Sequence, residues 1–167
     1  MERLIRAATV ADIPAIMQVL RAAKGIMRAT GNFNQWQGDY PSPDDILNDM
    51  RRDGARVVED DGRVTAYFAF LPSPEPTYNH IYHGQWLDDA LPYHVVHRMG
   101  SYPDVHNIFS DVMNYCFSVN PNIRIDTHRD NTVMQHCILG YGFVYCGIIL
   151  LANGDERLAY QRIETPD

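Results

Sequence analysis

Apolar residues recur along the chain at two spacings, one typical of strands and one typical of helices. Residues 4 to 8 are predicted to form a short first strand. Thr9 and Asp12 occupy the two positions of a capping box directly before a helical stretch. One apolar stripe then follows at helical spacing: Ile13, Ile16, Met17 and Leu20. The chain is therefore predicted to open with a strand and a helix.

The start of a second helix is marked by the polar residues around it. Ser42 is a favourable N-cap and Pro43 suits the first helical position. Asp44 and Asp45 place negative charge at the positive end of the helix dipole. We expect Gly54 to end this helix.

Strands and two further helices make up the rest of the chain. Asp60-Asp61-Gly62 and Asn153-Gly154 predict hairpin turns, and Gly142 is expected to close a helix that Asp130 or Asn131 caps. The predicted strands are residues 56–59, 64–70, 93–99, 122–127, 143–151 and 157–163, and the helices centre on residues 108–116 and 134–141. This order, βααβββαβαββ, predicts a three-layer α/β (α+β) sandwich around a mixed central sheet.

The composition narrows the class of protein. A chain of 167 residues with 46% hydrophobic and 21% charged residues fits one folded domain, residues 1–167. A net charge of −7 argues against nucleic-acid binding, which needs a basic face. The longest apolar run, Cys146 to Ala152, is too short to cross a membrane, and the N-terminus lacks a signal-peptide pattern. We therefore expect a cytoplasmic protein that binds neither nucleic acid nor membrane.

The cysteines and histidines do not predict a metal site. The three cysteines are scattered in apolar stretches, which favours buried thiols over a disulfide framework or a zinc site. His80 and His83, and likewise His94 and His97, are three positions apart. The second pair falls in a predicted strand, where such a spacing points the side chains to opposite faces. No metal is expected.

The C-terminal third carries a family likeness. Residues 123–131, IRIDTHRDN, are followed by Gly142-Phe143, and Asn131 precedes Phe143 by twelve residues. The opening IRAATVADI of residues 5–13 and the loop QWQGDYP of residues 35–41 add to it. Together they resemble the GNAT superfamily of acetyl-coenzyme-A-dependent N-acyltransferases, in particular a bacterial subfamily with a QWxxxYP loop. The likeness covers essentially the whole chain and implies the GNAT fold.

The resemblance also implies acetyl-coenzyme A as co-substrate, held at the end of the fourth strand and in the loop after it. The implied binding residues are Met99, Gly100, Ser101, His106, Asn107, Ile108, Phe109, Ser110 and Asn131. The family's loop has a basic residue and small residues here, whereas this chain has Asp104 and Phe109. A helix N-terminus can still bind a pyrophosphate through its N–H groups, and Asn107 tolerates unusual backbone angles. The alternative is a catalytically degenerate GNAT-fold protein that binds a ligand or partner.

The family reaction implies an oxyanion donor, a base and an acid. Backbone N–H groups near Met99 to Ser101 are expected to stabilise the oxyanion. The position of the family's usual Tyr acid is Ile138 here. His97 and His128 are the catalytic candidates, because imidazole titrates near neutral pH. Each is alternatively a hydrogen-bonded structural histidine.

An acceptor pocket is expected from the loop between the first two helices and from the segment before the fourth strand. Its predicted lining is Trp36, Tyr40, Glu75, Tyr78 and Trp86, with Glu75 binding a cationic amine and the aromatics forming a wall. The alternative is that the aromatics only fix long loops to the core. The acceptor is a small-molecule amine or a peptide, and pairing with a second copy into a homodimer is left open by the resemblance.

Overall fold

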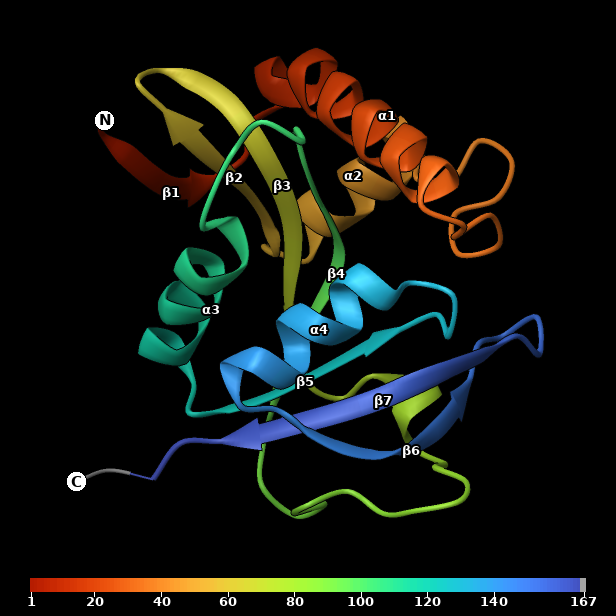
Figure 1. The fold of residues 1–167 in the computed structure, drawn as a ribbon. Coiled ribbons are helices and arrows are strands. Elements are labelled where there is room, and N and C mark those ends of the chain that lie inside the picture. The colour runs from red at the N-terminus through yellow and green to blue at the C-terminus, as the bar shows by residue number, and fades with distance from the viewer. Residues whose placement is uncertain (166–167) are drawn as a thin grey trace.

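Seven strands form one mixed sheet in the computed structural model, which describes residues 1–165 (Figure 1). The strands are β1 (Arg3–Ala7), β2 (Ala55–Asp60), β3 (Arg63–Pro72), β4 (His94–Ser101), β5 (Asn122–Thr127), β6 (Val144–Leu150) and β7 (Glu156–Ile163). The helices are α1 (Ile13–Ala29), α2 (Pro43–Arg51), α3 (Ile108–Val119) and α4 (Thr132–Tyr141), with 3-10 turns η1 (Val10–Asp12) and η2 (Pro76–Tyr78). The predicted order of elements is confirmed.

The strands lie in the order β1-β2-β3-β4-β5-β7-β6. Every neighbouring pair is antiparallel except β4 and β5. A parallel pair needs a crossover, which α3 supplies. The predicted hairpins close β2 with β3 and β6 with β7.

Helices cover both faces of the sheet. On one face, α1 and α2 pack over β2, β3 and β4, with Leu20, Ile46 and Tyr67 fully buried between them. On the other face, α3 and α4 cover the central strands, and Val112, Met113 and Ile138 face the sheet (Figure 1). The sandwich therefore has three layers, as predicted.

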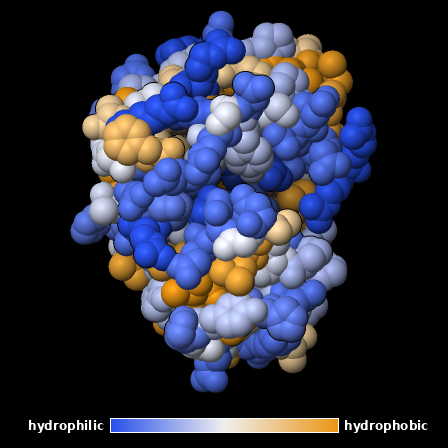
Figure 2. Space-filling model, turned by 90° about the vertical axis from the view of Figure 1, so that its right-hand side faces the viewer, coloured by the Kyte–Doolittle hydropathy of each residue, from blue (hydrophilic) through white to orange (hydrophobic). Residues whose placement is uncertain are grey.

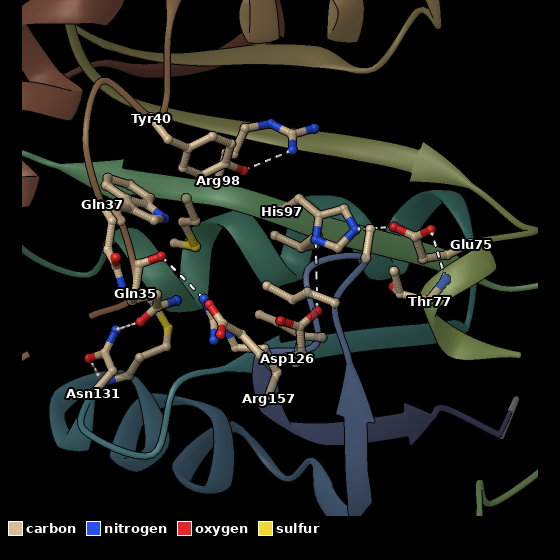
Figure 3. A pocket seen from close by; sticks show the side chains of 18 of the residues that line it. Gln35, Gln37, Tyr40, Glu75, Thr77, His97, Arg98, Asp126, Asn131 and Arg157 are labelled. Atoms are coloured by element: carbon tan, nitrogen blue, oxygen red, sulfur yellow. Dashed lines mark hydrogen bonds and ion pairs between the residues drawn. The ribbon is translucent and has the colours of Figure 1, made fainter. Parts of the chain in front are cut away.

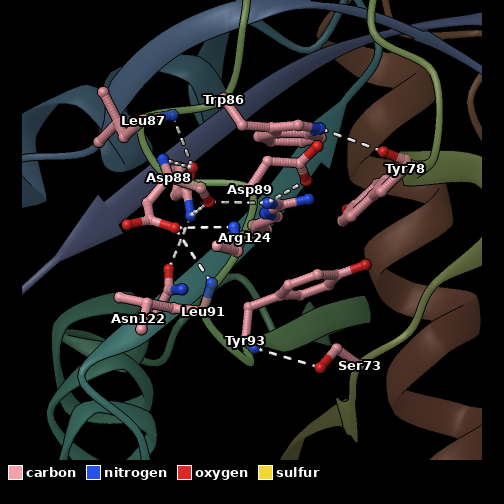
Figure 4. Close-up of polar contacts among 12 residues, drawn as sticks. Ser73, Tyr78, Trp86, Leu87, Asp88, Asp89, Leu91, Tyr93, Asn122 and Arg124 are labelled. Atoms are coloured by element: carbon pink, nitrogen blue, oxygen red, sulfur yellow. Dashed lines mark hydrogen bonds and ion pairs between the residues drawn. The ribbon is translucent and has the colours of Figure 1, made fainter.

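The segment of residues 73–93 packs against β5, β6 and β7 on the α1 side of the sheet. It surrounds the guanidinium of Arg124, which stacks 4.0 Å from the ring centroids of both Trp86 and Tyr93. Arg124 also donates to the carbonyl of Asp88 and to the carboxylate of Asp89 (Figure 4). One buried cation thus fixes a long loop to the sheet.

Two irregularities in β4 shape the centre of the sheet. The pairing of β4 with β5 covers only His94 to Val96, so the two strands separate beyond that point. In the ladder with β3, β4 has one extra residue near Arg98, whose φ is +50°. A wedge between β4 and β5 therefore opens beside a bulge.

One expectation about a helix end is wrong. The left-handed residue after α2 is Asp53, with φ +56°, and Gly54 does not take that conformation. A Cβ at Gly54 would lie 2.7 Å from the carbonyl oxygen of Phe70. Glycine is needed there for close packing against β3, because no side-chain atom fits.

No helix within residues 1–165 is long and apolar enough to cross a membrane.

Candidate active site

Two cavities meet where β4 and β5 separate. The first, which we call the polar cavity, has a volume of about 600 Å³. Its lining residues with acidic, basic or imidazole side chains are Arg52, Glu75, His97, Arg98, Asp126, Asp155 and Arg157. The second, the apolar groove, has a volume of about 690 Å³ and lies between β4, α3, α4 and the end of α1. Both are lined by Met27, Met99, Asn131 and Met134, so the two cavities adjoin at these residues.

His97 is at the centre of the polar cavity (Figure 3). Its Nε2 lies 3.0 Å from Glu75 Oε1, and its Nδ1 lies 3.8 Å from Asp126 Oδ2. Tyr78 donates its hydroxyl to the same Asp126 oxygen at 2.5 Å. The hydrogen bond to His97 holds the pKa of Glu75 below its usual value. Burial and the Asp126 charge raise the pKa of Tyr78, so its proton stays on the phenol.

The bulge residue Arg98 is bound by the buried carboxylate of Asp49 on α2. Arg98 Nε donates to Asp49 Oδ2 at 2.9 Å, and a second guanidinium nitrogen contacts the other Asp49 oxygen. Tyr67 donates its hydroxyl to Asp49 at 2.6 Å, and Arg98 donates to the Tyr40 hydroxyl at 3.1 Å. Asp49 therefore neutralises Arg98 and supports the bulge from α2.

Gln35 lines one side of the polar cavity. Its Oε1 accepts hydrogen bonds from Asn131 Nδ2 at 2.9 Å and from Asn32 Nδ2 at 3.0 Å. Its carbonyl accepts from Arg157 Nη2 at 3.2 Å. The loop between α1 and α2 is thus tied to α4 and β7, which come much later in the chain. Figure 2 shows the right-hand side of the view in Figure 1, where this loop lies, and hydrophilic side chains predominate on that face.

The apolar groove ends at the start of α3. Asn107 adopts a left-handed conformation, with φ +62°, and leads the chain into the helix. The first turn of a helix leaves N–H groups without intrahelical acceptors. On the opposite wall, the edge of β4 from His97 to Ser101 has no strand partner on its β5 side within residues 1–165. Free backbone groups therefore line both walls.

Solved structures similar to this chain include acetyltransferases, although no family model and no curated protein matches the chain. A GNAT-family acetyltransferase from Streptococcus agalactiae 2603 is 32% identical, with a TM-score of 0.90 over 98% of this chain and 96% of that chain. The chain belongs to the GNAT family of acetyltransferases.

More distant structures share the GNAT fold. A GNAT-family acetyltransferase from Listeria monocytogenes 4b F2365 is 16% identical, with a TM-score of 0.67 over 98% of this chain and 96% of that chain. The ribosomal-protein-S18-alanine N-acetyltransferase of Escherichia coli is 12% identical, with a TM-score of 0.62 over 99% of this chain and 97% of that chain.

The residues expected to hold the donor lie together. The apolar groove is lined by all nine: Met99, Gly100, Ser101, His106, Asn107, Ile108, Phe109, Ser110 and Asn131. Asp104, which stands where the family has a basic residue, is exposed and absent from the lining. Phe109 turns toward α4, where its ring meets Tyr141 edge-on at 6.2 Å between centroids. The loop therefore differs in sequence from that of the GNAT family, but the groove beside it is open.

The residues expected to hold the acceptor are divided. Trp36, Tyr40 and Glu75 line the polar cavity. Tyr78 and Trp86 do not line it. Both are buried, and Trp86 Nε1 donates to the Tyr78 carbonyl at 3.1 Å. The contacts of Tyr78 and Trp86 fit the alternative interpretation, in which the aromatic residues fix the loop to the core.

His97 and His128 have different surroundings. His97 faces the polar cavity, whereas His128 lines neither cavity. Nδ1 of His128 accepts from the backbone N–H of Asp130 at 3.0 Å, and burial lowers its pKa. Sequence reasoning did not find Asp126 or Arg157. The alternation of β5 places Asp126 opposite the buried isoleucines, but only the fold shows that this face meets a cavity.

Proposed function

We propose that this GNAT protein transfers the acetyl group of acetyl-coenzyme A to the amine of a small molecule or peptide. The observation that carries the proposal is the junction of two cavities at Met99 and Asn131. One cavity is suited to a long, largely apolar arm, and the other presents an imidazole beside two carboxylates.

The donor fits the apolar groove. The pantetheine arm would run along the unpaired edge of β4, whose backbone groups supply hydrogen bonds. The pyrophosphate would lie at the N-terminus of α3, where free N–H groups and the helix dipole favour an anion. His106 lines the same end of the groove and is the basic side chain nearest in sequence to the helix start.

The reaction follows from the placement of His97. A neutral amine attacks the thioester carbonyl, the carbon–nitrogen bond forms, and the carbon–sulfur bond breaks to release the thiolate. His97 takes the proton that the incoming ammonium must lose. The Glu75 carboxylate, ionised because its pKa is held low, orients the ring and stabilises its protonated form. Backbone N–H groups of the β4 edge stabilise the oxyanion.

In this proposal the attacking nitrogen loses its remaining extra proton to water as the amide forms, and water returns a proton to the thiolate. The family's tyrosine position is occupied by Ile138, which is fully buried in the core. Tyr141, one turn later, donates its hydroxyl to Asn114 at 2.7 Å and stacks on Phe117. A thiolate is a good leaving group, so transfer does not depend on an enzymatic acid.

The first experiment is a calorimetric titration of the purified protein with acetyl-coenzyme A, with 3′-dephospho-coenzyme A as comparison. Micromolar binding, followed by thiol release in the presence of an amine, is the expected result. Absence of binding at millimolar ligand would overturn the proposal. Binding without turnover of any amine would favour the alternative, a GNAT scaffold that binds a ligand without transfer.

A further inference from the structure

Arg157 is a buried cation that has no acidic partner among residues 1–165. Its relative exposure is 6%, and it lines the polar cavity but not the apolar groove. Nη1 donates to the carbonyl of Glu156 at 2.9 Å and Nη2 to the carbonyl of Gln35 at 3.2 Å. Within residues 1–165, no carboxylate lies within 4.0 Å of its guanidinium nitrogens. Two neutral carbonyls therefore leave the charge uncompensated.

The charges of the other arginines in and beneath this site are either paired with a carboxylate or exposed to water. Arg98 is paired with Asp49, and Arg124 is paired with Asp89. Arg52 is exposed at the cavity wall, where water screens its charge. Asp155 also lines the cavity, but its carboxylate accepts from Asn153 in the β6–β7 turn at 3.1 Å. Arg157 is thus the one buried and unpaired cation in the described lining.

A buried guanidinium is stabilised when a carboxylate or phosphate binds its planar set of donors. Since no such group comes from residues 1–165, an anion in the cavity would complete the site. The cavity is open to solvent and water partly solvates the guanidinium until such a ligand arrives.

A negative charge, the carboxylate of Asp126, lies on the same face of the sheet as Arg157. Asp126 of β5 pairs with Ala159 of β7, and Arg157 is two residues before Ala159. Side chains of Asp126 and Arg157 therefore project from one face as diagonal neighbours, roughly 7 to 8 Å apart at Cα. Their charged groups do not form an ion pair within 4.0 Å. Figure 3 shows the Arg157 guanidinium next to Gln35, while Asp126 and Glu75 lie on the His97 side.

We infer that the acceptor is a free amino acid, bound with its carboxylate on Arg157 and its amine at His97. This inference rests on the proposed acetyl transfer and names the substrate class for it. The ammonium is attracted by Glu75 and Asp126 and gives its proton to His97 before attack. The carboxylate makes and breaks no bond, and its pairing with Arg157 directs the amine toward the junction with the apolar groove.

The test compares amines that differ only in the carboxylate. Glycine and methylamine, leucine and isopentylamine, and phenylalanine and phenethylamine are each assayed for thiol release from acetyl-coenzyme A. Amino-acid amides are added because they keep the ammonium and replace the carboxylate. We expect kcat/KM for the preferred amino acid to exceed that of its decarboxylated partner by about 10- to 100-fold.

Arg157→Gln should lower kcat/KM for the amino acid by a similar factor, mainly through KM, and change that for the matching amine less than about twofold. Arg157→Lys, which keeps the charge but not the planar fork, should show an intermediate loss. Arg129→Gln is the matched control, because Arg129 is exposed and pairs with Glu156 outside the cavity. Thermal melting and acetyl-coenzyme A binding of each variant confirm that it is folded.

Equal turnover of amines and amino acids, unaffected by Arg157→Gln, would overturn the inference and leave acetyl transfer standing. Binding of acetyl-coenzyme A without transfer to any amino acid would also overturn it. Loss of amino-acid and amine turnover alike in a folded Arg157→Gln variant would assign Arg157 a structural role instead. Failure to bind acetyl-coenzyme A would overturn the proposed function, and this inference with it.

Discussion

The polar cavity and the apolar groove lie on either side of the same pair of strands, but they are built from different groups. The polar cavity presents side chains, above all His97, Glu75 and Arg157. The groove presents backbone: the unpaired edge of β4 and the start of α3. A backbone site tolerates side-chain replacement, whereas a side-chain site does not. This difference explains how the loop at Asp104 and Phe109 can depart from its family while the groove stays open.

The two regions are also supported differently. Beneath the polar cavity, Asp49 holds Arg98 in the bulge of β4. Beside the groove, Arg3 of β1 donates to the carbonyl of His106 at 2.9 Å and to Asp111 at 2.8 Å. Both supports tie a strand to an element distant in sequence. Because the two supports share no residue, a substitution in one support should leave the other support unchanged.

The largest expected effect is on chemistry in the polar cavity. His97→Gln keeps a hydrogen-bonding side chain but cannot take a proton from the amine, so kcat should fall by about 100-fold or more. The dissociation constant of acetyl-coenzyme A, measured by calorimetry, should be unchanged. His128→Gln provides a direct comparison and should lower kcat far less. An equal loss in the two variants would contradict the assignment of the base to His97.

An effect of intermediate size is expected in the groove. Ser110→Asp places a carboxylate in the first turn of α3, where it favours the helix but repels a pyrophosphate. Acetyl-coenzyme A should bind about tenfold more weakly, with the melting temperature unchanged or raised.

Asp104→Asn is the control for Ser110→Asp, because Asp104 is exposed and outside the groove lining. It should change the dissociation constant less than about twofold, since water screens an exposed charge. If the two variants behaved alike, the pyrophosphate would not lie at the helix start.

The smallest effect concerns acid stability. The pKa of Glu75 is held below its usual value of 4.5 by the hydrogen bond to His97. A group with a depressed pKa stabilises the fold above its usual pKa, and this stabilisation is lost as the pH falls through the folded value. As the pH falls below 4.5, wild type should therefore lose unfolding free energy that Glu75→Gln does not lose. Urea melts of both proteins at several pH values measure it, and parallel curves would contradict it.

Much of the fold could be read from local signals. Ser42 accepts from the N–H of Asp45, Asn131 accepts from that of Met134, and Gly142 is left-handed at the end of α4. Such signals act within one turn, and the predicted bounds of β5 match the observed ones. Gly54 shows the limit: its role depends on Phe70 of β3, which the spacing around α2 cannot reveal.

The site depended on more than local signals. Alternation along β5 and β7 determines that Asp126 and Arg157 each share a face with particular neighbours in their own strand. Which face meets a cavity depends on the register between the strands and on the point where β4 and β5 separate. Trp86 turns inward onto Arg124, and Tyr78 turns inward to donate its hydroxyl to Asp126, and both are contacts between segments distant in the sequence.

The sequence by itself determined the order of elements, their caps and turns, and the family likeness, because these depend on residues close together in the chain. Only the tertiary structure decided that Glu75, His97 and Asp126 meet and that Arg157 lines the same cavity with no acidic partner in the described part of the chain. The physical reason is that charge pairing across a sheet depends on strand order and separation, and those are set by packing of the whole core.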